Sequence, residues 1–202
     1  MALVVVGGHS RNVGKTSVVA GLIAALPEFK WTAMKITQYG HSVCAHHGQA
    51  CDCANEDHSW TITEERDHAG FTDTSRFLVA GAERVWWARS EQGRLAEALP
   101  SVRQVLDKSE NAILESNSIV KFLRPDIYLT VLDPDTADFK QSAQEFLDRA
   151  DAVILHNSKQ NIRWDGVSLK PVAGCPMFRI SPPEYVTPEI VEFIREKLCK
   201  VR

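Results

Sequence analysis

The sequence predicts a three-layer α/β/α fold around a mostly parallel sheet of about seven strands. Short apolar runs rich in β-branched residues alternate with segments of helical period, which is the pattern of βα units. The chain has 202 residues, 44% of them hydrophobic, which suffices for one core and is short for two. We therefore expect a single domain over residues 1–202. Its expected strands are Leu3–Gly7, Trp31–Thr37, Arg84–Ala88, Ala112–Glu115, Ile127–Leu132, Ala152–Leu155 and Pro176–Ile180.

Helical spacing and helix-start signals place the helices between these strands. The first expected helix ends before Pro27, which cannot continue it. Thr136 is a candidate N-cap for the third helix, and Thr187 caps the last, whose first residue is Pro188. The expected helices are Lys15–Leu26, Leu95–Leu106, Phe139–Ala150 and a C-terminal helix from Pro188.

Charge and hydropathy exclude several classes of partner. The formal net charge is −3, so no overall positive field attracts nucleic acid or an anionic membrane. No apolar run approaches the roughly 20 residues of a membrane-spanning helix. The first residues show no basic segment before their short apolar stretch. We expect a cytoplasmic protein that binds neither nucleic acid nor membrane.

A glycine-containing loop follows the first expected strand and opens directly into a helix. Such a loop turns backbone N–H groups toward a phosphate chain, here from Gly8, Asn12, Val13, Gly14 and Ser17. Lys15 would neutralise β- and γ-phosphate oxygens, and the Thr16 hydroxyl would join a Mg²⁺ shell. His9 stands where the usual spacing has a glycine. We expect a site for ATP or GTP with Mg²⁺, and for His9 a packing role in the backbone of the loop.

Two stretches resemble known families. Gly8-x5-Gly14-Lys15-Thr16, with Val13 before the second glycine, resembles the loop of dethiobiotin synthetases, members of the SIMIBI class of phosphate-loop proteins. The segment 73–82, Asp-Thr-Ser-Arg-Phe-Leu-Val-Ala-Gly-Ala, is similar to one in molybdopterin-guanine dinucleotide biosynthesis protein B of the same class. The similarities span about the first 120 residues. They imply a P-loop NTPase fold, a homodimer and a small-molecule step.

Candidate catalytic and Mg²⁺-binding residues stand at strand ends, where open α/β sheets place their ligands. Glu115 ends the fourth expected strand and would hold Mg²⁺ together with Thr16. Lys35 ends the second, as in both families, and would bind phosphate or a developing anion. On family grounds Asp73 is a further Mg²⁺ ligand, or alternatively the N-cap of a helix over Thr74–Val79. Arg76 would contact a phosphate or form a surface salt bridge.

The sequence gives less specific evidence for recognition of the nucleotide base and for the role of a tryptophan pair. Asn157 ends the sixth expected strand, where dethiobiotin synthetases carry a base-reading asparagine. The guanine signature Asn-Lys-x-Asp is absent there, which favours adenine. The adjacent pair Trp86-Trp87 is expected to serve packing and interface contacts rather than stacking on a ligand.

A segment rich in cysteine and histidine lies in an insertion at about residues 39–72 that shows neither helical nor strand periodicity. An odd number of cysteines without an export signal argues against a disulfide framework. Three cysteines with one histidine would make a closed zinc site, and two histidines with one cysteine an open one. Redox-active thiols and a substrate-binding lid are the alternatives. The possible zinc ligands are His41, Cys44, His46, His47, Cys51, Cys53 and His58.

Together these features indicate a Mg²⁺-dependent P-loop NTPase that couples hydrolysis or phosphoryl transfer to a step on a small molecule not identified by the sequence. Molybdenum cofactor biosynthesis is the pathway that the resemblance implies first. The alternative is a dethiobiotin-synthetase-like ligase, in which a carbamate attacks the γ-phosphate. A nucleotide-gated protein that delivers a metal or cofactor forms a second class.

Overall fold

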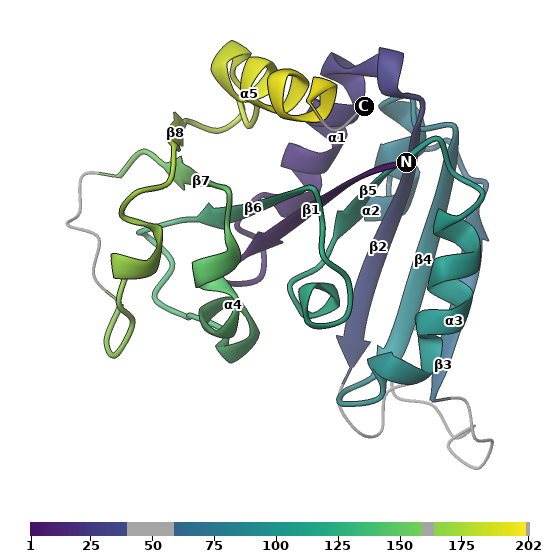
Figure 1. The fold of residues 1–202 in the computed structure, drawn as a ribbon, viewed down its shortest axis with the longest axis horizontal. Coiled ribbons are helices and arrows are strands. Elements are labelled where there is room, and N and C mark those ends of the chain that lie inside the picture. Colours follow the sequence, from purple (N-terminus) through teal and green to yellow (C-terminus); the bar gives the residue numbers. More distant parts are fainter. Residues whose placement is uncertain (40–58, 159–163, 201–202) are drawn as a thin grey trace.

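The computed structural model describes residues 1–39, 59–158 and 164–200. In this part of the chain one eight-stranded sheet runs in the order β3-β4-β2-β5-β1-β6-β7-β8 (Figure 1). Seven strands are parallel, and only β3 is antiparallel to its neighbour β4. The strands are β1 (Ala2–Gly8), β2 (Trp31–Tyr39), β3 (Trp60–Glu65), β4 (Arg84–Glu91), β5 (Asn111–Glu115), β6 (Ile127–Leu132), β7 (Ala152–His156) and β8 (Met177–Ile180).

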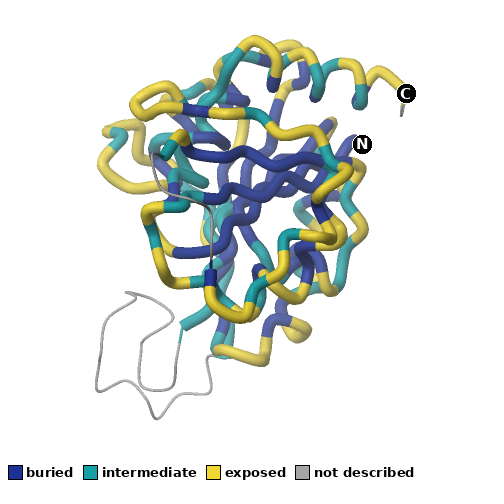
Figure 2. The backbone as a smooth tube through the Cα atoms, turned by 90° about the vertical axis from the view of Figure 1, so that its left-hand side faces the viewer, coloured by how far each residue is buried: buried dark blue, intermediate teal, exposed yellow. Residues whose placement is uncertain are grey.

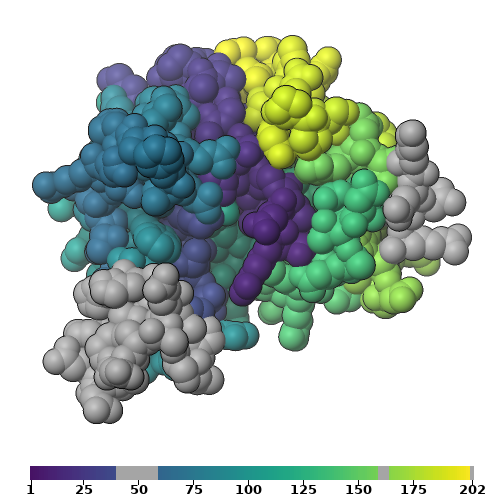
Figure 3. All heavy atoms as spheres, turned by 180° about the vertical axis from the view of Figure 1, so that it is seen from behind, coloured from purple at the N-terminus to yellow at the C-terminus, as the bar shows by residue number. Residues whose placement is uncertain are grey.

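Helices cover both faces of the sheet, which confirms the three-layer architecture. The helices are α1 (Lys15–Ala25), α2 (Asp73–Val79), α3 (Leu95–Leu106), α4 (Gln141–Glu145) and α5 (Pro188–Cys199). The side chains of β1 alternate between two apolar cores. Val4 and Val6 pack with α1, α2 and α5, whereas Leu3 and Val5 pack with α3 and the segment around α4. The central strands are accordingly buried from both sides (Figure 2), and α5 lies beside α1 at the C-terminal end (Figure 3).

Strand β3 corrects the expectation of about seven strands, and it shows that residues 60–65 of the stretch predicted as irregular, 39–72, are regular. It pairs with β4 from Trp60↔Ser90 to Glu65↔Val85 at the edge of the sheet. Only Trp60 and Ile62 of this strand pack against a core, and the rest is partly exposed or polar. Two apolar residues give too short an alternation to predict a strand, so pairing with β4 decides it.

The third expected helix is much shorter than predicted. α4 covers only residues 141–145 and is followed by a 3₁₀ turn, Leu147–Arg149, although Ala143, Phe146, Leu147 and Ala150 are buried as expected. Thr136 is not the N-cap, because its hydroxyl donates to Asp133 Oδ2 within the preceding loop. Residue 140 occupies the N-cap position instead.

The short helix α2 also starts differently from the alternative considered for Asp73. Thr72 is its N-cap, accepting from Ser75 N, and Ser75 Oγ accepts in return from Thr72 N. Asp73 is therefore in the first turn, which leaves its carboxylate available to another element. At the last helix Thr187 has N-cap backbone geometry but makes no side-chain capping bond. None of the helices described is long and apolar enough to cross a membrane.

Candidate functional site

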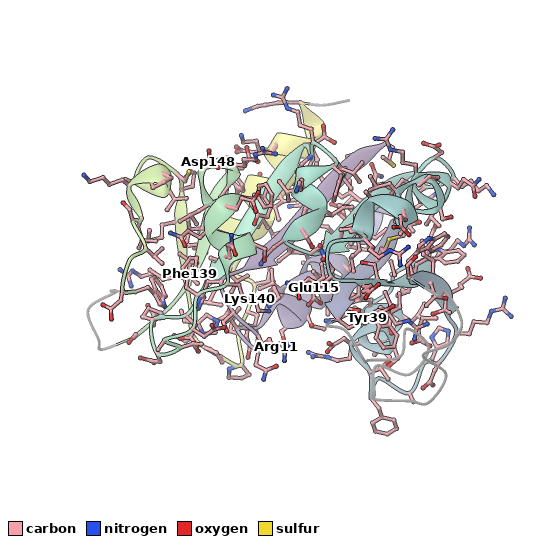
Figure 4. All side chains as sticks on the ribbon, turned by 90° about the horizontal axis from the view of Figure 1, so that it is seen from below. Arg11, Tyr39, Glu115, Phe139, Lys140 and Asp148 are labelled. Carbon is pink, nitrogen blue, oxygen red and sulfur yellow. The ribbon has the colours of Figure 1, made fainter. Side chains whose placement is uncertain are left out.

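A cleft of about 1060 Å³ opens at the carboxyl ends of β1, β2 and β5. Because these strands are neighbours in the sheet, three separate segments lie side by side: the loop after β1, Lys35 of β2 and Glu115 at the end of β5. Lys35 does not end its strand as predicted, because pairing with β4 carries β2 on to Tyr39. The start of α2, the segment that leads into α3, the turn after β5 and α4 with the loop before it supply further walls. Figure 4 looks onto this edge, where Arg11, Lys140 and Glu115 gather.

The loop between β1 and α1 is shaped by its two glycines. Gly14 has φ +88°, and a Cβ there would collide with the ring of Tyr185, so only glycine fits. A Cβ on Gly8 would approach Val13 Cγ2 and Lys15 Cγ to 2.9 Å. The predicted pair of glycines is thus required for the loop to fold tightly over the end of β1.

Lys15 points into the cleft without a carboxylate partner. Its Nζ donates to Ser10 O at 2.6 Å, and no ion pair joins it to an acid of the described residues. Burial lowers the pKa of Lys15 to about 8, although Glu115 acts in the opposite direction. A partly buried cation whose one bond among the described residues is to a carbonyl favours the arrival of an anion.

Glu115 joins two of the predicted residues. Its Oε2 accepts from Thr16 Oγ1 at 2.8 Å, and its Oε1 pairs with Lys35 Nζ at 2.7 Å. Lys35 also contacts Asp73 Oδ2 at 2.7 Å. Burial opposes protonation of Lys35, but the carboxylates of Glu115 and Asp73 raise its pKa above the usual value. Lys35 is therefore charged and fixed between two acids.

The donors around Thr16 suit a small hard cation. Mg²⁺ prefers oxygen ligands and usually keeps several waters, with one or two carboxylates and substrate phosphates completing the shell. The Thr16 hydroxyl and the carboxylates of Glu115 and Asp73 are such donors. Within the described ranges no cluster of three or more histidine, cysteine or acidic residues could hold a metal alone. A cation here would take its other ligands from nucleotide and water.

The cleft as a whole is positively charged, in contrast to the chain. Six basic and three acidic side chains line it among the described residues, against a formal charge of −3 overall. Such a cleft concentrates anions. The basic residues are Arg11, Lys15, Lys35, Arg76, Lys121 and Lys140, and the acidic ones are Asp73, Glu115 and Glu145.

The other residues singled out from the sequence have partners away from Glu115. Arg76 Nη2 donates to Ser17 Oγ at 3.0 Å at the mouth of the cleft. Asn157 lies at the end of β7 and donates to Ser181 Oγ at 2.8 Å. Trp87 Nε1 donates to Thr37 Oγ1, and Trp86 is partly buried against a core, in line with a packing role.

Three contributors to the site had no recognised motif. Asn117 closes the start of the loop, because it accepts from Gly8 N at 2.8 Å and donates to Gly8 O at 2.9 Å. Tyr185 lies on Gly14, and Lys140 enters from the loop before α4. One indirect sign of the third contributor, Lys140, was present in the sequence. His9 replaces the usual glycine of the loop, and its backbone carbonyl accepts from Lys140 N.

The predicted zinc ligands Cys44, Cys51, Cys53, His41, His46, His47 and His58 lie outside the described residues. The flanking strands are described. β2 and β3 bracket the segment, and Gln38 near the end of β2 lines the cleft. Of the remaining cysteines, Cys175 donates to Ala150 O and Cys199 is exposed, both as free thiols.

The fold of this chain is similar to that of several solved structures. LpxK from Aquifex aeolicus, in its "apo" form in complex with ATP, matches with a TM-score of 0.50 and 19% identity over 89% of this chain. The chain spans only 53% of that structure. The chain has the P-loop NTPase fold, as the sequence predicted.

Two further structures cover the chain almost completely at lower similarity. HypB from Helicobacter pylori, in complex with nickel, has a TM-score of 0.48 and 16% identity over 98% of this chain and 86% of its own. MobB from Bacillus subtilis has a TM-score of 0.45 and 15% identity over 98% of both chains. No protein-family model and no curated protein sequence matches the chain.

Proposed function

We propose that the protein is a Mg²⁺-dependent P-loop NTPase that hydrolyses a nucleoside triphosphate or transfers its γ-phosphoryl group. The observation that carries the proposal is that Glu115 contacts both Thr16, at 2.8 Å, and Lys35, at 2.7 Å. Beside them, Lys15 is bonded to a backbone carbonyl and to no carboxylate of the described residues. Phosphoryl transfer depends on positioning and on neutralising charge, and these residue types supply both.

Each residue has a role that follows from its contacts. Backbone N–H groups of the loop, including those of Gly14 and Ser17, would cradle the phosphates, and Lys15 would bind β- and γ-oxygens. Thr16 and Glu115, with Asp73, would hold Mg²⁺, which supplies charge neutralisation when bound. Lys35 would turn from Glu115 toward charge developing on the transferred group.

The proposal is tested by titrating a nonhydrolysable ATP or GTP analogue with Mg²⁺. Lys15→Ala should abolish detectable binding while the circular dichroism spectrum stays unchanged. Lys108→Ala, an exposed lysine at the far end of α3, serves as the matched control and should bind as the unaltered protein does. Equal affinities of the Lys15 variant and the control would refute the site.

Asn157 would read the base, with a preference for adenine. Its exposed amide reaches the loop after β8 through Ser181, and that loop also carries Tyr185 onto Gly14. Asn157→Ala should reduce the ratio of ATP to GTP affinity, and an unchanged ratio would exclude base reading by this residue.

The acceptor would be a small molecule, either in molybdenum cofactor biosynthesis or in a dethiobiotin-synthetase-like ligation. The ligation forms a carbamate from an amine and carbon dioxide before phosphoryl transfer. ADP release that requires both bicarbonate and an added amine would therefore favour the ligase, and release without them would exclude it. The resemblance implies a homodimer. Light scattering would then give a mass of twice that of the single chain, which is 22.5 kDa.

Nucleotide-gated delivery of a metal or cofactor is the second candidate. It is favoured by the placement of the Cys/His segment between β2, whose Gln38 lines the cleft, and the antiparallel β3. Metal analysis of untagged protein should then show transition metal, zinc first, at near one equivalent. Less than a tenth of an equivalent would exclude this function without affecting the NTPase proposal.

A further inference from the structure

His9 fastens the loop before α4 to the phosphate loop. Its Nδ1 lies 2.8 Å from Asp138 O, and its Nε2 accepts from Asp133 N at 3.0 Å. Because the Asp133 amide can only donate, Nε2 carries no proton and Nδ1 donates to Asp138 O. One neutral imidazole thus forms hydrogen bonds with both ends of the loop 133–138.

Further contacts make this arrangement rigid. His9 is fully buried and lies 4.9 Å from the ring centroid of Trp164 and 5.1 Å from that of Phe139. Ser10 Oγ donates to Asp138 Oδ2 at 2.6 Å. We call this set of contacts between His9 or Ser10 and residues 133–140 the His9 clasp.

The clasp fixes the position of Lys140 relative to the phosphate loop. The backbone N–H of Lys140 donates to His9 O at 2.8 Å, so this lysine is tied directly to the loop. Its side chain is half-buried and lines the same cleft as Lys15, Lys35 and Glu115. Among the described residues it forms no ion pair.

The electrostatic surroundings of Lys140 include other charged residues of the cleft. Burial, followed by the nearby cations Arg11 and Lys35, lowers its pKa, while Asp138 and Glu115 raise it. Figure 4 shows Lys140 near Arg11 and Glu115 at this edge of the sheet. Lys140 thus lies close enough to Lys35 and Glu115, in the same cleft, for their charges to act on it.

The charged residues around Glu115 do not by themselves neutralise a bound nucleotide. Lys15 and Lys35 are offset by Asp73 and Glu115, so these four residues sum to zero. A Mg²⁺-bound nucleoside triphosphate keeps about two negative charges. Lys140 is one of the lining cations that no ion pair joins to an acid of the described residues, with Arg11, Arg76 and Lys121. Of these four, Lys140 is the one whose backbone is hydrogen-bonded to the phosphate loop at His9 O.

We propose that Lys140 binds the terminal phosphate of the nucleoside triphosphate, in the same cleft as Lys35, and that the His9 clasp positions it there. The inference rests on the proposed NTPase function and extends it. It assigns Lys140 to triphosphate recognition and gives His9, the residue that departs from the usual loop, a positioning role.

The decisive measurement compares two ligands by calorimetry in the presence of Mg²⁺: the β,γ-imido analogue of ATP and ADP. Lys140→Gln should weaken binding of the triphosphate analogue by about tenfold or more, since a charge-assisted hydrogen bond is lost. Its ADP affinity should stay within about twofold. Lys140→Arg should restore most of the discrimination, and Lys108→Gln should leave both affinities unchanged.

The clasp is tested by His9→Phe, which keeps an aromatic ring but removes both ring hydrogen bonds. It should reduce the ratio of triphosphate to diphosphate affinity in the same way and shift the fluorescence of Trp164. If this variant does not fold, Asp138→Ala removes the acceptor of Ser10 and should lower the same ratio. An unchanged ratio in the folded variants would overturn the positioning role.

The outcomes separate this inference from the proposed function. Equal weakening of both ligands by Lys140→Gln, or no weakening, would overturn terminal-phosphate binding while leaving a nucleotide site. Failure of the unaltered protein to bind either ligand would overturn both proposals.

Discussion

Thr16 Oγ1 donates to Glu115 Oε2 at 2.8 Å, which joins residues 99 positions apart in the chain. The contact exists because β1 and β5 are adjacent, with Val6 opposite Glu115, so the loop after β1 starts beside the end of β5. A hydroxyl at a helix N-terminus and a carboxylate at a strand end thereby form one oxygen-rich corner of the cleft.

Glu115→Gln should remove most of the Mg²⁺ dependence of nucleotide binding. The amide keeps the size of the side chain but loses the charge that attracts the cation. We expect the gain in ATP-analogue affinity on adding Mg²⁺ to fall about tenfold, measured by calorimetry with Mg²⁺ and with EDTA. Glu110→Gln, whose exposed partner is Lys30, is the control. A full Mg²⁺ effect in the Glu115 variant would contradict this assignment.

Nucleotide affinity should fall as the pH rises above about 8. Burial lowers the pKa of Lys15 to about 8 in the free protein, and a bound phosphate would raise it. Binding therefore takes up a proton in this range, and affinity should decline toward tenfold per pH unit above pH 8. Titrations between pH 7.5 and about 9.5, in buffers of different ionisation enthalpy, measure both effects. A constant affinity across this range would show that Lys15 does not contact the ligand.

Lys15→Met should stabilise the nucleotide-free protein. The pKa of Lys15 is about 8 in the folded protein and near 10.5 in the unfolded chain, so folding disfavours the charged form at neutral pH. This cost is largest below pH 8 and disappears as the pH rises through about 10.5. The free energy of unfolding in urea at pH 7 should rise by about 1–3 kcal/mol. Lys108→Met should change it little, and a destabilised Lys15 variant would contradict the argument.

Asn111→Ala should destabilise the fold without changing the site. The buried amide accepts from Ala2 N at 3.1 Å and donates to Phe29 O at 2.7 Å, which joins β1 and the turn after α1 to β5. Removing the amide deletes two buried hydrogen bonds to the backbone and should lower the free energy of unfolding in urea by about 2–4 kcal/mol. The nucleotide affinity of the folded variant should stay unchanged. Gln104→Ala, on the exposed face of α3, is the matched control.

The sequence alone predicted the elements whose signals are local. The spacing Gly8-x5-Gly14-Lys15-Thr16 after an apolar strand depends on neighbouring residues only, and the loop appears where it was expected. Glu115 was recognised because it ends an apolar strand, and Lys35 because it follows the apolar first half of another, although β2 continues to Tyr39. The two-sided burial of β1 likewise follows from its continuous apolar run.

Only the tertiary structure decided which distant residues meet. The weak alternation of β3 became a strand through pairing with β4, and the apolar stripe after Lys140 became one short helix and a 3₁₀ turn. The positions of Asp73 beside Lys35 and of Lys140 on His9 depend on strand order and loop closure, which no local pattern encodes. Side chains separated by about a hundred residues share a cleft because the sheet places their strands together, and that choice is made by packing of the whole core.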